Sequence, residues 1–298
     1  MYIDKNRLLA VGAAVAALTL SACGGGGGGG SAEPTPGPTP GPGPIAATLS
    51  KDNYLDAFAL VSLAAMRLDA VTTVIDGSFR VVLSTNDTPG TYPCPQGGTV
   101  SVARIDANTR SFSTNNCNLG GVIVNSGKLT AVGAGATVVG GVSYLAGGDF
   151  TADQLRFTIP DGIVGEQTLS GQIKLKRNAD LTLSGSGNAT VLRNGRSDVY
   201  KDIIVATSTP DSHHDVSIDT LNFTLDTPRF PVQLNVKAGA TLATVSAPDG
   251  AQLRVDTNAK DDSIKLELRQ SATASPSLTT TLKAAEQTVL DAFSRVLK

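Results

Sequence analysis

The chain has 298 residues, of which 41% are hydrophobic and 17% are charged, and its net charge is −2. This length and apolar content allow one large or two ordinary domains with a substantial core, whereas the balanced charge excludes the basic surface that nucleic-acid binding requires. Two His and three Cys leave little material for a transition-metal centre, so we expect neither a metal nor a cofactor.

Residues 1–22 have the features of a secretory signal peptide. Lys5 and Arg7 give a positive start, and residues 8–20 form an apolar stretch rich in Ala, Leu and Val. Such a stretch is too short to cross the roughly 30 Å of hydrocarbon in a bilayer. We therefore predict that it directs secretion and is absent from the folded domain.

The end of this stretch, Leu20-Ser21-Ala22-Cys23, resembles the lipobox of bacterial lipoprotein precursors. The resemblance implies cleavage after Ala22, a diacylglycerol group on the Cys23 thiol and, usually, an acyl group on its amine. Several acyl chains anchor a protein stably where one binds only reversibly. The alternatives are an ordinary signal peptide or an uncleaved anchor in which the cysteine is coincidental.

The residue after Cys23 helps to indicate the membrane in which the protein is anchored. In Gram-negative lipoproteins an Asp at that position resembles an inner-membrane retention signal, and here Gly24 occupies it. We therefore expect a protein anchored in the outer membrane, with the periplasmic and surface faces both open as alternatives.

Residues 23–44 form a Gly/Pro-rich tether behind the cysteine. Seven consecutive glycines, Gly24–Gly30, are followed by a proline-rich stretch that ends at Pro44. The glycines predict a flexible coil and the prolines a semi-rigid extended segment. Neither part can bury enough apolar surface to fold, so we predict a spacer between membrane and body.

The remaining residues, 45–298, predict a β-rich globular domain with a helix at each end. Ser50 can cap a helix over residues 50–69 that no Gly or Pro interrupts. Residues 57–66 are apolar on nearly all sides, which indicates a core helix buried on more than one side, with a lipid- or partner-binding helix as the alternative. A second amphipathic helix is predicted over residues 280–297.

Between the two helices the pattern is that of short strands. Residues 230–237 alternate most clearly between apolar and polar, and Asn194-Gly195 and Pro248-Asp249-Gly250 are turn signals. About twelve to fifteen strands without intervening helices favour antiparallel pairing. We therefore predict a mainly β protein, with one strongly bent antiparallel sheet or a β-sandwich and both helices packed on it. Two β-subdomains that meet near residues 145–165 are the alternative.

Pro231 interrupts the clearest of these strands. Proline cannot donate a backbone hydrogen bond to a neighbouring strand. We therefore expect that strand to lie at an edge of the sheet, or the proline to face a gap in the hydrogen-bond ladder.

Cys94 and Cys117 are the two cysteines left if Cys23 is lipidated. In a secreted chain they predict a disulfide, which would join the ends of a hairpin. The stretch Cys94–Val100, its partner Cys117 and the helix at 50–69 resemble a set of uncharacterised β-rich envelope lipoproteins. That resemblance implies no particular activity.

Two polar clusters contain residue types that occur in catalytic or metal-binding sites. Ser212-His213-His214-Asp215 contains both His of the chain, but neighbouring residues of an extended segment point to opposite faces and cannot form a triad. Asp256, Asn258, Asp261 and Asp262 offer oxygen ligands, but Lys260 occupies a ligand position of the usual Ca²⁺ loop. We predict exposed loops at both places and no catalytic, cofactor-binding or metal-binding residue.

Taken together, these patterns favour a non-catalytic envelope lipoprotein. Its partners would be the membrane, through Cys23, and either an apolar ligand or an envelope protein. A structural or adhesive surface module is the alternative, and a hydrolase of envelope polymers is a weaker one because no residue set for hydrolysis presents itself.

The lipid anchor predicts a direct outcome for the variant Cys23→Ser. Without the thiol no diacylglycerol can be attached, so the variant should not incorporate labelled fatty acid and should be soluble or unprocessed. Metabolic labelling and membrane fractionation measure both properties. Labelling of the variant and its continued presence in the outer membrane would show that the lipobox interpretation is wrong.

Overall fold

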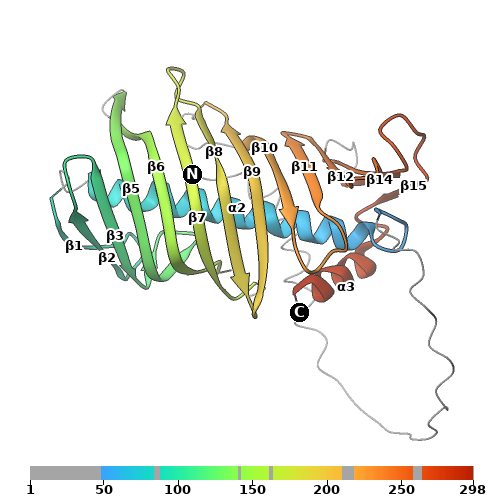
Figure 1. Ribbon diagram of the computed structural model, residues 1–298, viewed down its shortest axis with the longest axis horizontal. Helices are drawn as coiled ribbons and strands as arrows, with labels where there is room; N and C mark the ends of the chain where they lie inside the picture. The colour runs from blue at the N-terminus through green and yellow to red at the C-terminus, as the bar shows by residue number, and fades with distance from the viewer. Residues whose placement is uncertain are drawn as a thin grey trace, which may run out of the picture.

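The computed structural model describes residues 48–83, 88–139, 142–160, 164–209, 218–257 and 264–297. They form one open antiparallel sheet, a long helix that crosses one face of the sheet, and a shorter helix beside the first (Figure 1). The predicted mainly β fold with two packed helices is confirmed. The features predicted for residues 1–44 lie outside the described residues.

The sheet contains 15 strands, and the strands of its main path lie side by side in chain order. Only β4 leaves this path, where it pairs with β5. The elements are α2 Tyr54–Leu83, β1 Gly90–Pro93, β2 Thr99–Arg104, β3 Thr109–Asn115, β4 Cys117–Asn118, β5 Ile123–Val139, β6 Val142–Thr158, β7 Glu166–Arg177, β8 Leu183–Arg193, β9 Arg196–Thr207, β10 Ile218–Asp226, β11 Leu234–Gly239, β12 Leu242–Ser246, β13 Gln252–Asp256, β14 Lys265–Arg269, β15 Leu278–Thr281 and α3 Glu286–Leu297.

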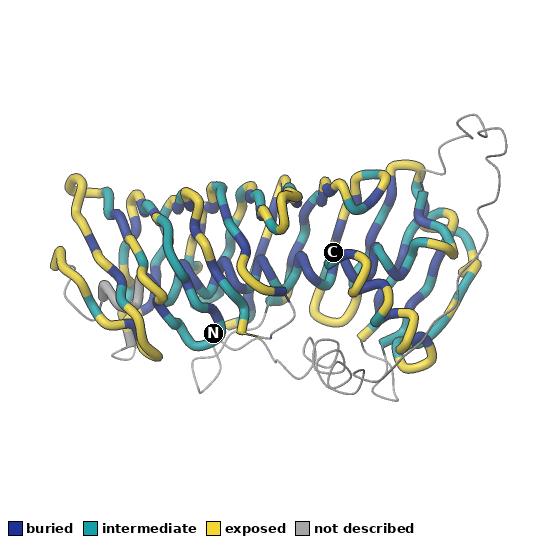
Figure 2. The backbone as a smooth tube through the Cα atoms, turned by 90° about the horizontal axis from the view of Figure 1, so that it is seen from below, coloured by how far each residue is buried: buried dark blue, intermediate teal, exposed yellow. Residues whose placement is uncertain are grey.

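The sheet is continuous across β6 and β7, near which two subdomains were the alternative. Strand β6 pairs with β5 on one side and, from Gly147 to Thr158, with β7 on the other. Buried and exposed residues alternate along the strands (Figure 2), as expected for a sheet with one dry and one wet face.

One row of paired residues shows how the dry face is built. Successive cross-strand partners from nine strands lie at positions that face α2, and we call this side of the sheet the helix-covered face. The row is Val102, Phe112, Leu129, Ala152, Gly171, Ala189, Tyr200, Leu225 and Leu234. All of them except Gly171 are buried. Side chains alternate between the two faces along each strand. The neighbours of each row member on its own strand therefore point to the other face, which is in contact with solvent.

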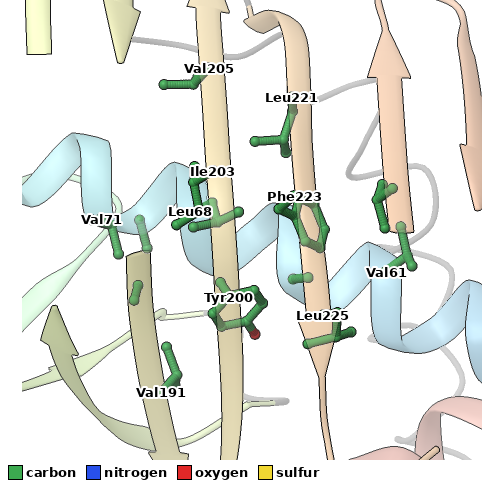
Figure 3. Packing of buried hydrophobic residues seen from close by; sticks show 14 of the residues in the cluster. Val61, Leu68, Val71, Val191, Tyr200, Ile203, Val205, Leu221, Phe223 and Leu225 are labelled. Carbon is green, nitrogen blue, oxygen red and sulfur yellow. The ribbon is translucent and has the colours of Figure 1, made fainter. Parts of the chain in front are cut away.

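The middle of this row consists of small residues. Ala152, Gly171 and Ala189 lie on β6, β7 and β8, and the backbone of α2 lies close to that of β6. Gly185 on β8 leaves no room for a larger residue, since a Cβ there would lie 2.6 Å from Leu175 Cδ2 and 2.8 Å from Val205 Cγ1. Beyond this narrow strip, on β9 and β10, the larger side chains of Tyr200, Phe223 and Leu225 pack against the helix (Figure 3).

Helix α2 is much longer than the predicted helix at 50–69. It begins at Tyr54, four residues after the predicted start, and a turn precedes it in which the Ser50 carbonyl accepts a hydrogen bond from the N–H of Tyr54 at 3.0 Å. Its end does not agree with the prediction, because the helix continues to Leu83. The β-branched residues after Asp69 favour a strand locally, but Val71, Val74 and Ile75 are buried at helical spacing. Tertiary burial therefore overrides local propensity.

Helix α2 is long enough to cross about nine neighbouring strands of the sheet. Thirty residues give about 45 Å of helix, which corresponds to about nine strand spacings. The stretch Tyr54–Ser78 is also long and apolar enough to cross a membrane by composition, with a mean hydropathy of 1.7, but 67% of that apolar window is buried inside the molecule. The structure therefore packs α2 as the core helix that the sequence predicted.

Helix α3 begins at Glu286, six residues after its predicted start. Thr280 and Thr281 belong instead to β15, where they pair with β14. α3 packs along the N-terminal part of α2, where the rings of Phe58 and Phe293 meet edge to face at 6.4 Å. The predicted burial of α2 on more than one side is thus confirmed.

The predictions for Pro231 were wrong. Phe230, Pro231 and Val232 lie in the connection between β10 and β11, and β11 begins at Leu234. β11 pairs with both β10 and β12, so it is an interior strand. The proline thus lies before the strand, where no ladder hydrogen bond needs its missing N–H.

Both predicted turns are present. Asn194 and Gly195 have φ values of +50° and +73°, and they connect β8 to β9 as a tight hairpin turn with two positive φ angles. The turn that contains Gly250, at φ +90°, connects β12 to β13.

The disulfide between Cys94 and Cys117 is formed, with 5.4 Å between the two Cα atoms. It joins the residues that flank the hairpin of β2 and β3, as predicted. Because β1 and β2 lie at one end of the sheet, the disulfide ties this end of the sheet to β4.

The contact between α2 and α3 predicts the effect of Phe58→Ala. Phe58 is 4% exposed, so removal of its ring should lower the free energy of unfolding by about 3–5 kcal/mol. Urea denaturation followed by circular dichroism measures this loss. In the double variant with Phe293→Ala the two losses should not add, because both remove the same ring contact. Unfolding like that of the wild type would show that the ring is not a structural element.

Candidate functional site: a buried arginine cluster

A group of polar side chains lies buried between α2 and the sheet. Arg67, near the middle of α2, is 1% exposed. Its neighbours come from β7, β9 and the segment that follows β10. We call this group the arginine cluster; its members are Arg67, Gln167, Asp198, Tyr200, Thr227 and Arg229.

Asp198 is the centre of the arginine cluster. Its Oδ2 accepts a hydrogen bond from Arg67 Nη1, and its Oδ1 accepts one from Arg229 Nη1 at 2.5 Å and one from Thr227 Oγ1 at 2.5 Å. The two arginine side chains are 2% and 3% exposed, and that of the aspartate is 1% exposed. One buried carboxylate is therefore shared by two buried guanidinium groups.

Tyr200 and Gln167 bind the other side of Arg67. The Tyr200 hydroxyl accepts a hydrogen bond from Arg67 Nη1 at 2.9 Å, and Gln167 Oε1 accepts one from Arg67 Nε. Burial raises the pKa of Tyr200, so this phenol is neutral at physiological pH. Its ring meets that of Phe223 on the neighbouring strand edge to face at 5.8 Å (Figure 3).

Arg67 remains charged in this setting. Burial by itself would lower the pKa of Arg67, but the oxygens of Tyr200 and Asp198 favour the charged form, and the net effect raises the pKa. A raised arginine pKa means that the guanidinium is protonated at every physiological pH.

Charges and hydrogen bonds in the arginine cluster do not balance. Two guanidinium groups face one carboxylate, which leaves one excess positive charge among these described residues. Four buried donors also have no acceptor there: Arg67 Nη2, Gln167 Nε2, Arg229 Nε and Arg229 Nη2. A buried donor without a partner costs about 1–3 kcal/mol. Packing alone therefore does not account for the arginine cluster.

The sequence positions these groups through simple periodicities. Arg67 follows Leu63 by four residues on α2, which places both on the same side of the helix. Asp198 and Tyr200 are two residues apart on β9 and therefore share a face. Arg229 is held by a local turn, in which its N–H donates to Thr227 Oγ1 at 3.2 Å.

The residues singled out in the sequence do not contribute to this site. Cys23 and residues 212–215 lie outside the described residues, as do Asn258, Lys260, Asp261 and Asp262, while Asp256 ends β13. Cys94 and Cys117 are joined by the disulfide. Within the described part of the chain, no group of three or more His, Cys, Asp or Glu side chains is placed to hold a metal ion.

Sequence reasoning missed the arginine cluster because its members are far apart in the chain. Arg67 and Asp198 are 131 residues apart. One signal was available: Arg67 directly follows the strongly apolar residues 57–66 of α2, and a charge among buried residues is rare unless it is paired. The sequence gives no sign of the partner, because nothing links an arginine on α2 to one particular aspartate.

Comparison with protein-family models, with curated proteins and with solved structures finds no match for this chain. The site is therefore interpreted from its own geometry. It offers fixed positive charge and hydrogen-bond donors in an apolar setting, with a neutral phenol and a carboxylate held by three donors. The excess positive charge and the unpartnered donors make this arrangement suited to binding a negative group.

The shared carboxylate predicts a large effect for Asp198→Asn. The change leaves two buried guanidinium groups facing a neutral amide, so the free energy of unfolding should fall by about 3–5 kcal/mol. Asp226→Asn is the matched control, because the exposed Asp226 pairs with Lys201 at 3.4 Å and its loss should cost less than about 1 kcal/mol. Equal losses in urea denaturation would show that the buried pairing contributes little to stability.

Proposed function

We propose that this protein is a non-catalytic, lipid-anchored protein of the bacterial envelope that binds an apolar ligand between α2 and the sheet. The observation that carries the proposal is the helix-covered face, a continuous apolar face that crosses nine strands and is covered mainly by one helix. A ligand with an apolar chain can replace contacts that α2 makes there, because contacts between apolar groups are not directional.

The N-terminal segment supports the location in this proposal. The signal-like residues 1–22, the lipobox ending at Cys23 and the Gly/Pro-rich tether to residue 44 favour a domain held near a membrane surface. The disulfide between Cys94 and Cys117 fits an oxidising compartment. Such a location would place the helix-covered face within reach of lipids.

Helix α2 would act as the cover of the ligand site. Leu63 and Leu68 on α2, like the sheet residues opposite, are already buried. A ligand that enters must therefore move part of α2 away from the sheet. This movement can be tested in the C-terminal half of α2, where Gly77 lies against Leu119 in the connection between β4 and β5.

A disulfide lock between α2 and the sheet tests the proposal. A Cβ on Gly77 would lie 3.4 Å from Leu119 Cβ, close to the spacing of about 3.5–4.5 Å in disulfides, so Gly77→Cys with Leu119→Cys should cross-link. The oxidised double variant should bind the uncharged fluorophore N-phenyl-1-naphthylamine at least about fivefold more weakly than the wild type, because the closed state is then fixed.

The controls separate the lock from side effects of the substitutions. Each single cysteine variant should bind the fluorophore like the wild type, and reduction should restore binding to the double variant. Wild-type protein under the same reductant accounts for loss of the native disulfide. Native mass spectrometry of protein taken from its own envelope should also detect a retained lipid. Unchanged binding by the locked protein would contradict the proposal.

A second candidate function is a structural surface module. The tight packing of α2 on the sheet favours it, since Ala57, Phe58 and Leu60 are among the most buried residues. A structural module would retain no lipid and bind the fluorophore neither in the locked nor in the reduced state. The same two measurements therefore distinguish the two functions.

A further inference from the structure

The four unpartnered donors of the arginine cluster belong to side chains that meet at one carboxylate. Arg67 and Arg229 bind the two oxygens of Asp198, which brings their guanidinium groups close together, and Gln167 binds the Nε of Arg67. The remaining donors are two nitrogens of Arg229 and one each of Arg67 and Gln167, all buried. Their hydrogen-bonding capacity therefore lies in one small region of the interface.

The charge of this region points to the kind of group that would complete it. One excess positive charge remains after Asp198 has been counted, and a buried charge is costly unless an opposite charge balances it. Every unpartnered atom of the arginine cluster is a donor, so the group that completes the cluster must be an acceptor. A guanidinium presents its donors as a planar fork that fits carboxylate and phosphate oxygens.

We propose that Arg67 and Arg229 form a binding site for a single oxyanion, a carboxylate or a phosphate, with Gln167 as a third donor. The proposal rests on the proposed function for the source of that oxyanion, which would be the acidic head group of the apolar ligand. Asp198 then acts as a positioning residue, because it holds both guanidinium groups side by side without contacting the ligand.

The location of the site suits a ligand with an acidic head and an apolar chain. Arg229 lies in the segment after β10, at the end of a strand, and its backbone reaches the surface although its side chain is buried. Tyr200, Leu225 and Leu234 continue from there along the apolar row. A head group at the arginines would therefore leave its chain on the helix-covered face.

Binding of matched probes tests the proposal. Full-length protein carrying Cys23→Ser is used, so that no attached acyl chain competes for the site. Isothermal titration calorimetry should show decanoate binding at least about tenfold more tightly than decanol, a ratio that corresponds to about 1.4 kcal/mol. Arg229→Gln should remove most of this preference, and Arg229→Lys should keep part of it, because the charge remains but the fork is lost.

Arg156→Gln is the matched control for the substitution. Arg156 lies on the exposed face and pairs with Glu166, so its loss should leave the preference for decanoate unchanged. Far-UV circular dichroism checks that each variant is folded. The comparison of decanoate with decanol on the protein without further changes needs no arginine variant and remains decisive if Arg229→Gln does not fold.

The remaining outcomes separate the oxyanion site from the proposed function. Equal binding of decanoate and decanol would overturn the oxyanion site and leave the apolar ligand site standing. Binding of acetate or inorganic phosphate as tightly as decanoate would support the site but assign it to a free anion. Binding of none of these probes would overturn both proposals.

Discussion

Coverage of one apolar face is the constraint on which the rest of this structure depends. A 15-stranded sheet that does not close exposes an apolar surface along its whole width unless another element covers it, and a wet surface of that size would aggregate. Helix α2 solves this problem with a single element whose length matches about nine strand spacings. The small residues on β6, β7 and β8 and the packing of α3 on its other side follow from this need.

Apolar packing alone does not fix how a helix lies on a sheet, because it is not directional. The arginine cluster supplies a directional contact near the middle of α2, where Arg67 binds groups from β7 and β9. Removal of one partner from such a buried set is costly, although replacement of the whole set by apolar residues often is not. In the proposed function, the excess charge of the arginine cluster therefore serves ligand binding rather than stability.

A binding site beneath a helix also links ligand entry to movement of that helix. In the proposed function the same apolar face serves α2 in one state and the ligand in the other, so the two compete for one surface. Such competition needs only a small difference in free energy between the two states. The tether and the lipid at Cys23, where present, would keep this exchange close to the membrane that supplies the ligand.

The amino-acid sequence by itself determined the class of the fold. Period-two alternation, the turn at Asn194-Gly195 and the absence of intervening helices specified an antiparallel sheet, because these signals are local. The capping residue Ser50 indicated the start of α2 to within four residues. The cysteine pair was also readable, because few pairings were possible. Only the tertiary structure decided that α2 continues through β-branched residues to Leu83, that β11 is an interior strand, and that Arg67 meets Asp198 and Arg229. The first and the third depend on contacts with elements far away in the chain, and the second depends on pairing of β11 with both of its neighbours. No local preference encodes such contacts.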